Sequence, residues 1–168
     1  MERGTIQILN DFPSEYLHNK RNVAVYLPHG YEDSDARFPV VYLHDGQSMF
    51  GTGWYADRTA DRLISSGAVP PVILVAVDCN TQDRRREMCH DTPPQSRRMG
   101  RKGYVPCHSF DGEGLGVLYE RFLIEEVKGY IDGHFRTKPE PENTAIAGSS
   151  MGGIVSFRIG MRHPDVFG

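Results

Sequence analysis

Residues 148–152, GSSMG, match the pattern Gly-x-Ser-x-Gly. In this pattern the serine stands on a sharp turn from a strand into a helix, where larger flanking side chains would clash. Only Ser150 fits, because the corresponding neighbours of Ser149 are Ala147 and Met151. The spacing therefore predicts that Ser150 is a nucleophile that attacks a carbonyl carbon; the alternative is a glycine-rich turn without chemistry.

The elements on both sides of this turn fit such a role. Residues 143–148 form an apolar run typical of a buried strand, and residues 152–163 have the pattern of a helix that ends before Pro164. The amino end of a helix carries a partial positive charge. That charge would stabilise an oxyanion formed beside Ser150.

The rest of the chain alternates apolar strands with helices. This order predicts an α/β fold, a mostly parallel sheet with helices on both faces, in which the first two strands are antiparallel. The expected strands are residues 4–9, 22–27, 39–44, 70–78 and 143–148, and the expected helices are residues 56–67, 115–135 and 152–163.

Composition and charge argue against nucleic-acid binding and membrane proteins. A chain of 168 residues with a net charge of −3 fits one domain and gives no sign of a nucleic-acid partner. Since no apolar run approaches the roughly 20 residues of a membrane helix, we expect no membrane partner. The first residues lack the apolar core of a signal peptide, and the three cysteines suggest reduced thiols, so we expect a cytoplasmic protein.

Three stretches carry a resemblance to a known family. They are VVYLHDGQSMF, GSSMGG and the segment FLIEEVKGYIDGHFRTKPEPENTAIAGSSMGG. From about residue 20 onward the chain resembles the Putative esterase family of α/β-hydrolases, which includes enterochelin esterases, esterase D, feruloyl esterases and mycolyl transferases. The resemblance implies a three-layer α/β-hydrolase sandwich, an ester-hydrolysing or acyl-transferring site, and no cofactor or metal. His134 departs from the family, where an aromatic residue often stands.

The resemblance also implies an oxyanion hole. Its donors would be the backbone N–H of Met151 and an N–H from the loop after residues 39–44, either Gln47 or Gly46. The carboxyl ends of neighbouring parallel strands meet at one rim of a sheet, which is where open α/β sheets bind ligands.

Five further residues are expected to shape the substrate pocket. By resemblance, His44 shapes the oxyanion loop, and Trp54 packs near the pocket, unless it is simply a core aromatic. Asp45 is expected to support that loop or to border the pocket. An arginine after the strand at residues 70–78 often faces the substrate in the family, and Arg85 or Arg86 fits this position best.

Residues 79–114 lack periodicity and are expected to form a long loop. Its cations suggest either a solvated surface or a positive lip for an anionic ester. The pairs Cys89-His90 and Cys107-His108 do not have the spacing of a zinc site, so we expect no metal there. The cations are Arg84, Arg85, Arg86, Arg97, Arg98, Arg101 and Lys102.

The general base and its acid are not evident. In the family both follow the nucleophile, yet only 18 residues follow Ser150. They include His163, but a helix of about 12 residues would hold that side chain about 18 Å away. His44, His90 and His108 are weaker candidates.

The sequence therefore resembles the amino-terminal two-thirds of such an esterase, a single incomplete domain over residues 1–168. A fragment, a natural truncation or a partner copy acting in trans would each explain this. An exposed apolar sheet edge would favour a homo-oligomer. We expect a serine esterase acting on a small-molecule carboxylic ester through an acyl-enzyme at Ser150. The alternatives are a catalytically impaired binding or self-associating module, and an acyltransferase.

Overall fold

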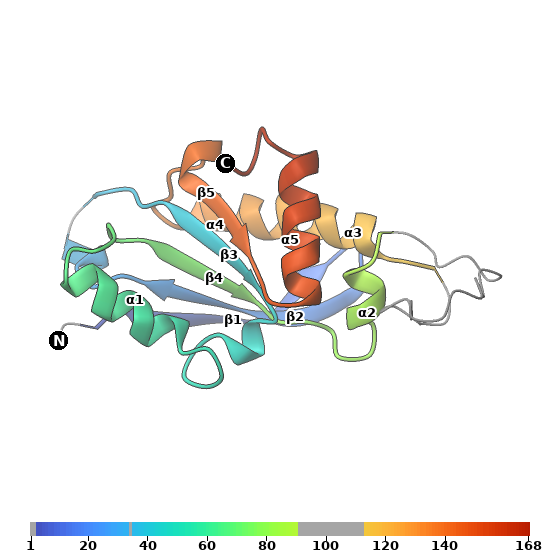
Figure 1. Cartoon of the computed structure of the whole chain (residues 1–168), viewed down its shortest axis with the longest axis horizontal. Helices are drawn as coiled ribbons and strands as arrows, with labels where there is room; N and C mark the ends of the chain where they lie inside the picture. The colour runs from blue at the N-terminus through green and yellow to red at the C-terminus, as the bar shows by residue number, and fades with distance from the viewer. Residues whose placement is uncertain (1–2, 34, 91–112) are drawn as a thin grey trace, which may run out of the picture.

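The computed structural model describes residues 3–33, 35–90 and 113–168. Their strands form one five-stranded sheet in the order β1-β2-β4-β3-β5 (Figure 1). The first pair is an antiparallel hairpin, β2 is antiparallel to β4, and β3 is parallel to both β4 and β5. The strands are β1 (Thr5–Ser14), β2 (Asn19–Leu27), β3 (Val40–His44), β4 (Ile73–Val77) and β5 (Thr144–Ala147).

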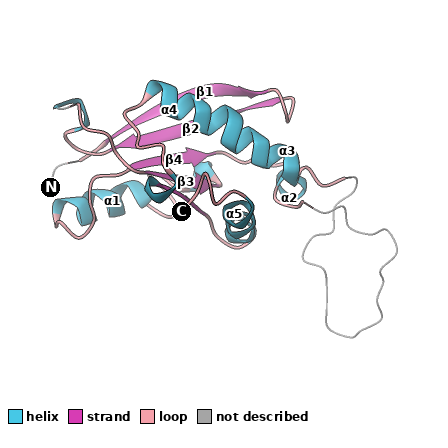
Figure 2. Ribbon diagram, turned by 90° about the horizontal axis from the view of Figure 1, so that it is seen from above, coloured by secondary structure: helices cyan, strands magenta, loops and turns pink. Residues whose placement is uncertain are grey.

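Helices follow the strands in the order that the sequence predicts. The long helix expected at residues 115–135 is present as one rod, but its middle third, η3, is π-helical (Figure 2). The helices are α1 (Ala56–Ser65), α2 (Arg84–Glu87), α3 (Gly116–Arg121), η3 (Phe122–Lys128), α4 (Gly129–His134) and α5 (Met151–Arg162), with short 3-10 turns η1 (Tyr31–Asp33), η2 (Gly46–Ser48) and η4 (Pro141–Asn143).

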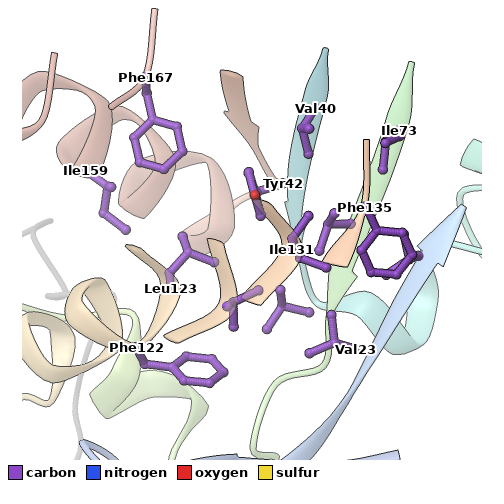
Figure 3. Packing of buried hydrophobic residues seen from close by; sticks show 14 of the residues in the cluster. Val23, Val40, Tyr42, Ile73, Phe122, Leu123, Ile131, Phe135, Ile159 and Phe167 are labelled. Atoms are coloured by element: carbon purple, nitrogen blue, oxygen red, sulfur yellow. The ribbon is translucent and has the colours of Figure 1, made fainter. Parts of the chain in front are cut away.

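The helices cover both faces of the sheet, which confirms the three-layer α/β architecture. On one face, side chains of α3, η3, α4 and α5 form the main core with the strands, including Phe122, Ile131 and Ile159 against Val40 and Tyr42 (Figure 3). On the other face, α1 forms a smaller cluster with the sheet, and Ala60 packs there with Tyr26 and Leu74. The predicted long loop is partly helical, because α2 lies in it; residues 91–112 lie outside the described part of the chain.

The sheet has an open edge at β5, which pairs with β3. Next to this edge, α5 carries three apolar side chains that are largely exposed: Ile154 at 57%, Phe157 at 72% and Met161 at 69%. Together they form a stripe at helical spacing, which we call the α5 stripe. Within the described residues, no helix has the length and apolarity needed to span a membrane.

Candidate active site

The turn between β5 and α5 has the geometry expected of a nucleophile elbow. Ser150 has φ 54° and ψ −117°, a strained conformation for any residue with a side chain. A Cβ placed on Gly148 would lie 2.7 Å from the carbonyl carbon of Gly152, so a side chain cannot fit there. The turn is closed by the Gly152 N–H, which donates to the carbonyl of Ser149 at 2.8 Å.

Ser150 is exposed and faces a pocket of about 320 Å³ at the carboxyl rim of the parallel strands. The pocket combines the strained serine with polar groups from the β3–α1 connection and from α2, which matches the rim where α/β sheets bind ligands. Its lining consists of Asp45, Gln47, Ser48, Met49, Trp54, Arg84, Ser149 and Ser150.

The loop after β3 lines the same pocket as Ser150. It turns at Asp45, which is left-handed with φ 58° and ψ 47°, and continues as η2. Gly46 backs directly onto β4, because an added Cβ would lie 2.7 Å from the carbonyl oxygen of Ala76. Gln47 is exposed and lines the pocket. Of the two residues, Gln47 is thus the one that lines the pocket, while Gly46 packs against β4.

Two backbone donors at this site have no acceptor in the part of the chain that the structure describes. In η2 the N–H groups of Ser48 and Met49 donate to the carbonyls of Asp45 and Gly46. Over the described ranges, by contrast, no protein group accepts the N–H of Gln47 or of Met151, the first residue of α5. Such N–H groups beside a serine can bind a developing oxyanion.

Two further side chains hold this loop: Arg84, one of the cations expected at the lip of the site, and Cys79, which no sequence pattern indicates. The Arg84 guanidinium donates two hydrogen bonds to the Asp45 carboxylate, from Nε to Oδ1 at 2.6 Å and from Nη2 to Oδ2 at 2.8 Å. Burial alone would raise the pKa of Asp45, but Arg84 outweighs it and holds that pKa below its usual range. Cys79 and Gln47 form two hydrogen bonds. The Cys79 N–H donates to Oε1 of Gln47 at 3.2 Å, and Nε2 of Gln47 donates to Sγ of Cys79 at 3.0 Å.

The structure places the pocket cation at Arg84, not at Arg85 or Arg86. The Arg86 side chain points to Asp83, at 2.9 Å, and to the Glu113 carbonyl, at 2.9 Å, while Arg85 is exposed outside the pocket lining. Each step along a helix turns the side chain by about 100°, so three consecutive arginines point in three directions. Only the tertiary placement of α2 selects among them. Arg97, Arg98, Arg101 and Lys102 lie outside the described residues.

His44 lies behind the elbow and is absent from the pocket lining, contrary to the expectation that it borders the substrate. It is 1% exposed, and its Nδ1 hydrogen-bonds the Tyr119 hydroxyl at 2.7 Å. Burial lowers the pKa of His44 to about 4, so the ring is neutral at pH 7. A Cβ on Gly152 would come within 3.4 Å of the His44 Cβ, which shows how closely this ring supports the turn.

The other histidine candidates are engaged elsewhere. His163 bonds Glu120 at 2.6 Å and His90 bonds the same carboxylate at 2.9 Å. His163 caps α5 at the end opposite Ser150, about 18 Å away along the 12-residue helix. His108 lies outside the described residues. Among those that are described, no histidine hydrogen-bonds the Ser150 hydroxyl.

The described part of the chain contains no group of three or more His, Cys, Asp or Glu side chains arranged to hold a metal ion. Cys89 and His90 fall within it, while Cys107 and His108 do not. Trp54 is 61% exposed and forms one wall of the pocket, so it is not a core aromatic.

Comparison with known proteins identifies relatives of this chain in sequence and fold. The family model described as Putative esterase matches residues 14–168. An endo-1,4-beta-xylanase/feruloyl esterase of Xylanibacter ruminicola is 31% identical over 176 aligned positions, which cover all of this chain and 21% of that protein. The ferri-bacillibactin esterase BesA of Bacillus subtilis is 29% identical, over 79% of this chain and 45% of that protein.

A solved esterase structure is similar to this chain in fold as well. A CE1 ferulic acid esterase of Anaeromyces mucronatus, AmCE1/Fae1A, superposes with a TM-score of 0.70 and 26% identity, covering all of this chain and 57% of that one. The present chain thus spans about half or less of the length of these relatives.

Proposed function

Because this chain belongs to the Putative esterase family, we propose that it is a serine hydrolase of carboxylic esters with Ser150 as its nucleophile. One observation carries the proposal. Ser150 is held in a strained conformation at the mouth of the pocket, beside the two N–H groups of Gln47 and Met151. Strain of this kind persists where the surrounding structure over-determines it, as it does at nucleophile elbows.

In the proposed reaction, the Ser150 Oγ bonds to the ester carbonyl carbon as its proton passes to a general base. The carbonyl oxygen becomes an oxyanion, which accepts hydrogen bonds from the N–H groups of Gln47 and Met151. Collapse breaks the bond to the alcohol oxygen, which leaves with a proton, and gives an acyl-enzyme. Water then attacks the acyl carbon, releases the acid and restores Ser150.

The general base is proposed to come from a group outside the described residues, in this chain or in a second polypeptide. The support is that the neutral His44 faces Tyr119, while His90 and His163 face Glu120. The substrate is proposed to be a small-molecule carboxylic ester, in keeping with the feruloyl and ferri-bacillibactin esterases among the relatives. The exposed ring of Trp54 offers it an apolar wall.

A fluorophosphonate probe tests this proposal, because it phosphonylates only an activated serine. We expect mass spectrometry to find the adduct on Ser150. The Ser150→Ala variant should take up no probe, and the matched Ser149→Ala variant should react at the wild-type rate. Absence of labelling from the folded chain would refute the proposal for this chain by itself and would favour the catalytically impaired alternative.

A second proposal concerns self-association, which the exposed α5 stripe and the open edge of β5 favour. We propose that the partner is a second copy of this chain, because two β5 edges can pair antiparallel about a twofold axis and bring two α5 stripes together. Ala145, Ile146 and Phe167 form a groove of about 340 Å³ between strand and stripe, which adds apolar surface to this edge.

A further inference from the structure

The two donors of the proposed oxyanion hole come from segments far apart in the chain. Gln47 follows β3, whereas Met151 begins α5, and the two are 104 positions apart in the sequence. Stabilising a single oxygen requires both N–H groups to keep a fixed separation to within a fraction of an ångström. The pairing of β3 with β5 holds the two strands together, and a side chain that contacts both segments beyond the strand ends would fix the separation of the donors further.

One side chain contacts both segments. The Arg84 guanidinium donates from Nε and Nη2 to the two carboxylate oxygens of Asp45, at 2.6 and 2.8 Å. Its third nitrogen, Nη1, lies 3.8 Å from the thioether sulfur of Met151. A guanidinium presents these three contacts from three nitrogens in one rigid plane, an arrangement that the single nitrogen of an ammonium does not reproduce.

The Asp45 end of this bridge sets the direction of the oxyanion loop. Its backbone is left-handed, with φ 58°, a conformation that residues other than glycine adopt at a cost. The two bonds from Arg84 fix the carboxylate, and Asp45 directly precedes η2, the turn that presents the N–H of Gln47. The Arg84 side chain is 31% exposed and that of Asp45 only 15%, so water screens this pair incompletely.

This bridge is itself anchored in the core. Glu87, three residues after Arg84 in α2, forms a buried ion pair with Arg21 of β2 at 2.8 Å. The Arg21 guanidinium lies over the ring of Phe122 and over that of Tyr119, whose hydroxyl bonds His44. His44 precedes Asp45 in the chain, so this series of contacts leads from Arg84 through the core and back to Asp45, the residue that Arg84 binds.

We infer that Arg84 is a positioning residue, which sets the separation of the Gln47 and Met151 N–H groups by bridging Asp45 to Met151. The inference rests on the proposed function, since it concerns the same oxyanion hole. It differs from the lip of cations expected from the sequence, because Arg84 acts through protein groups and not through a charged substrate.

The first measurement follows the backbone amides and needs no activity. In ¹H–¹⁵N spectra of the full chain, Arg84→Met should shift the amide signals of both Gln47 and Met151 and speed their exchange with solvent. Asp45→Asn, which keeps the left-handed preference, should do the same if Arg84→Met folds poorly. The matched control is Arg121→Met, which removes an exposed Arg–carboxylate pair with Glu125. Unchanged Gln47 and Met151 amides in a folded Arg84 or Asp45 variant would overturn the inference.

The second measurement is the rate of fluorophosphonate labelling at Ser150. Misplaced oxyanion donors should slow labelling on the order of tenfold to a hundredfold in each of the single variants Arg84→Met, Arg84→Lys and Asp45→Asn. The double variant Arg84→Met/Asp45→Asn should be labelled no more slowly than the slower of its two single variants. A fall in Arg84→Met with Asp45→Asn unaffected would instead mean that Arg84 acts on the probe directly. If the wild-type chain takes up no probe, the proposed function fails, and the amide measurement still decides the role of Arg84.

Discussion

Gly148 and Gly152 face each other across the elbow so closely that a Cβ on Gly148 would lie 2.7 Å from the carbonyl carbon of Gly152. The contact is with backbone, which cannot move aside without opening the turn that carries Ser150. At Gly152 the corresponding contacts are with side-chain atoms of His44 and Asp45, at 3.4 and 3.5 Å. The two glycines of the motif are therefore required to different degrees.

Gly148→Ala should lower the free energy of unfolding by about 2 kcal/mol or more, because backbone must shift to admit the methyl group. Gly152→Ala should cost less. The control is Gly160→Ala in the same helix, where an added Cβ meets nothing within 4 Å. That substitution should stabilise the chain by about 0.5–1 kcal/mol. Urea unfolding measures all three, and equal losses at Gly148 and Gly160 would contradict the prediction.

Ser150→Gly should stabilise the fold while removing the proposed nucleophile. A φ of 54° with ψ of −117° is unfavourable for serine but accessible to glycine, so we expect a gain of about 1 kcal/mol. Ser149→Gly serves as the control, because Ser149 does not have a positive φ and should gain nothing. A loss of stability in Ser150→Gly, measured by thermal unfolding, would show that the elbow is not strained.

Breaking the buried ion pair between Arg21 and Glu87 should be costly. The two side chains are 2% and 1% exposed, so removing one leaves the other charge buried without a partner. We expect Arg21→Met to lower the unfolding free energy by about 3 kcal/mol or more, and the Arg21→Met/Glu87→Met double variant to recover part of that loss.

The exposed pair of Arg121 with Glu125 supplies the contrast, and Arg121→Met should cause no comparable loss in the same urea titration. If the Arg21→Met variant were as stable as Arg121→Met, the ion pair would not be the anchor of α2 described above.

His44 should make the fold less stable in acid. The unfolded chain protonates this ring below about pH 6.5, whereas the folded chain keeps it neutral until its pKa of about 4. The stabilisation is therefore complete above pH 6.5 and is lost as the pH falls toward 4, by about 2 kcal/mol between pH 8 and pH 5. Urea unfolding at both values measures it. His44→Asn, which can still bond Tyr119, should remove this part of the pH dependence, and an unchanged slope would contradict the assignment.

The proposed self-association makes a direct prediction. In sedimentation or light scattering, the wild-type chain should have a mass above the 18.9 kDa of one copy. Phe157→Glu should restore the monomer by placing a charge in the α5 stripe. Val117→Glu, on α3, is the control, because Val117 is 47% exposed but lies away from β5. A monomeric wild-type chain, or a dimer unaffected by Phe157→Glu, would exclude this interface.

That Ser150 and not Ser149 is the nucleophile stays a prediction. The sequence by itself did determine the α/β architecture and the position of the strand–turn–helix unit that carries Ser150. These follow from local rules: strand and helix periodicity, and the need for glycines two residues on either side of a serine in a tight turn. The apolar run at residues 143–148 corresponds to β5, and the helix after it to α5. The family resemblance pointed to the loop after β3, and Asp45, Gln47 and Trp54 line the pocket beside Ser150.

Only the tertiary structure decided which polar side chains serve that turn. Three arginines in a row are equivalent by composition, but packing of α2 against β2 through Glu87 aims Arg84 at the pocket. Strand alternation by itself puts His44 on the buried face of β3 with Val40 and Tyr42, but its hydrogen bond to Tyr119 depends on where the helix at residues 116–134 packs. Such directions depend on contacts between segments far apart in sequence, which no local pattern encodes.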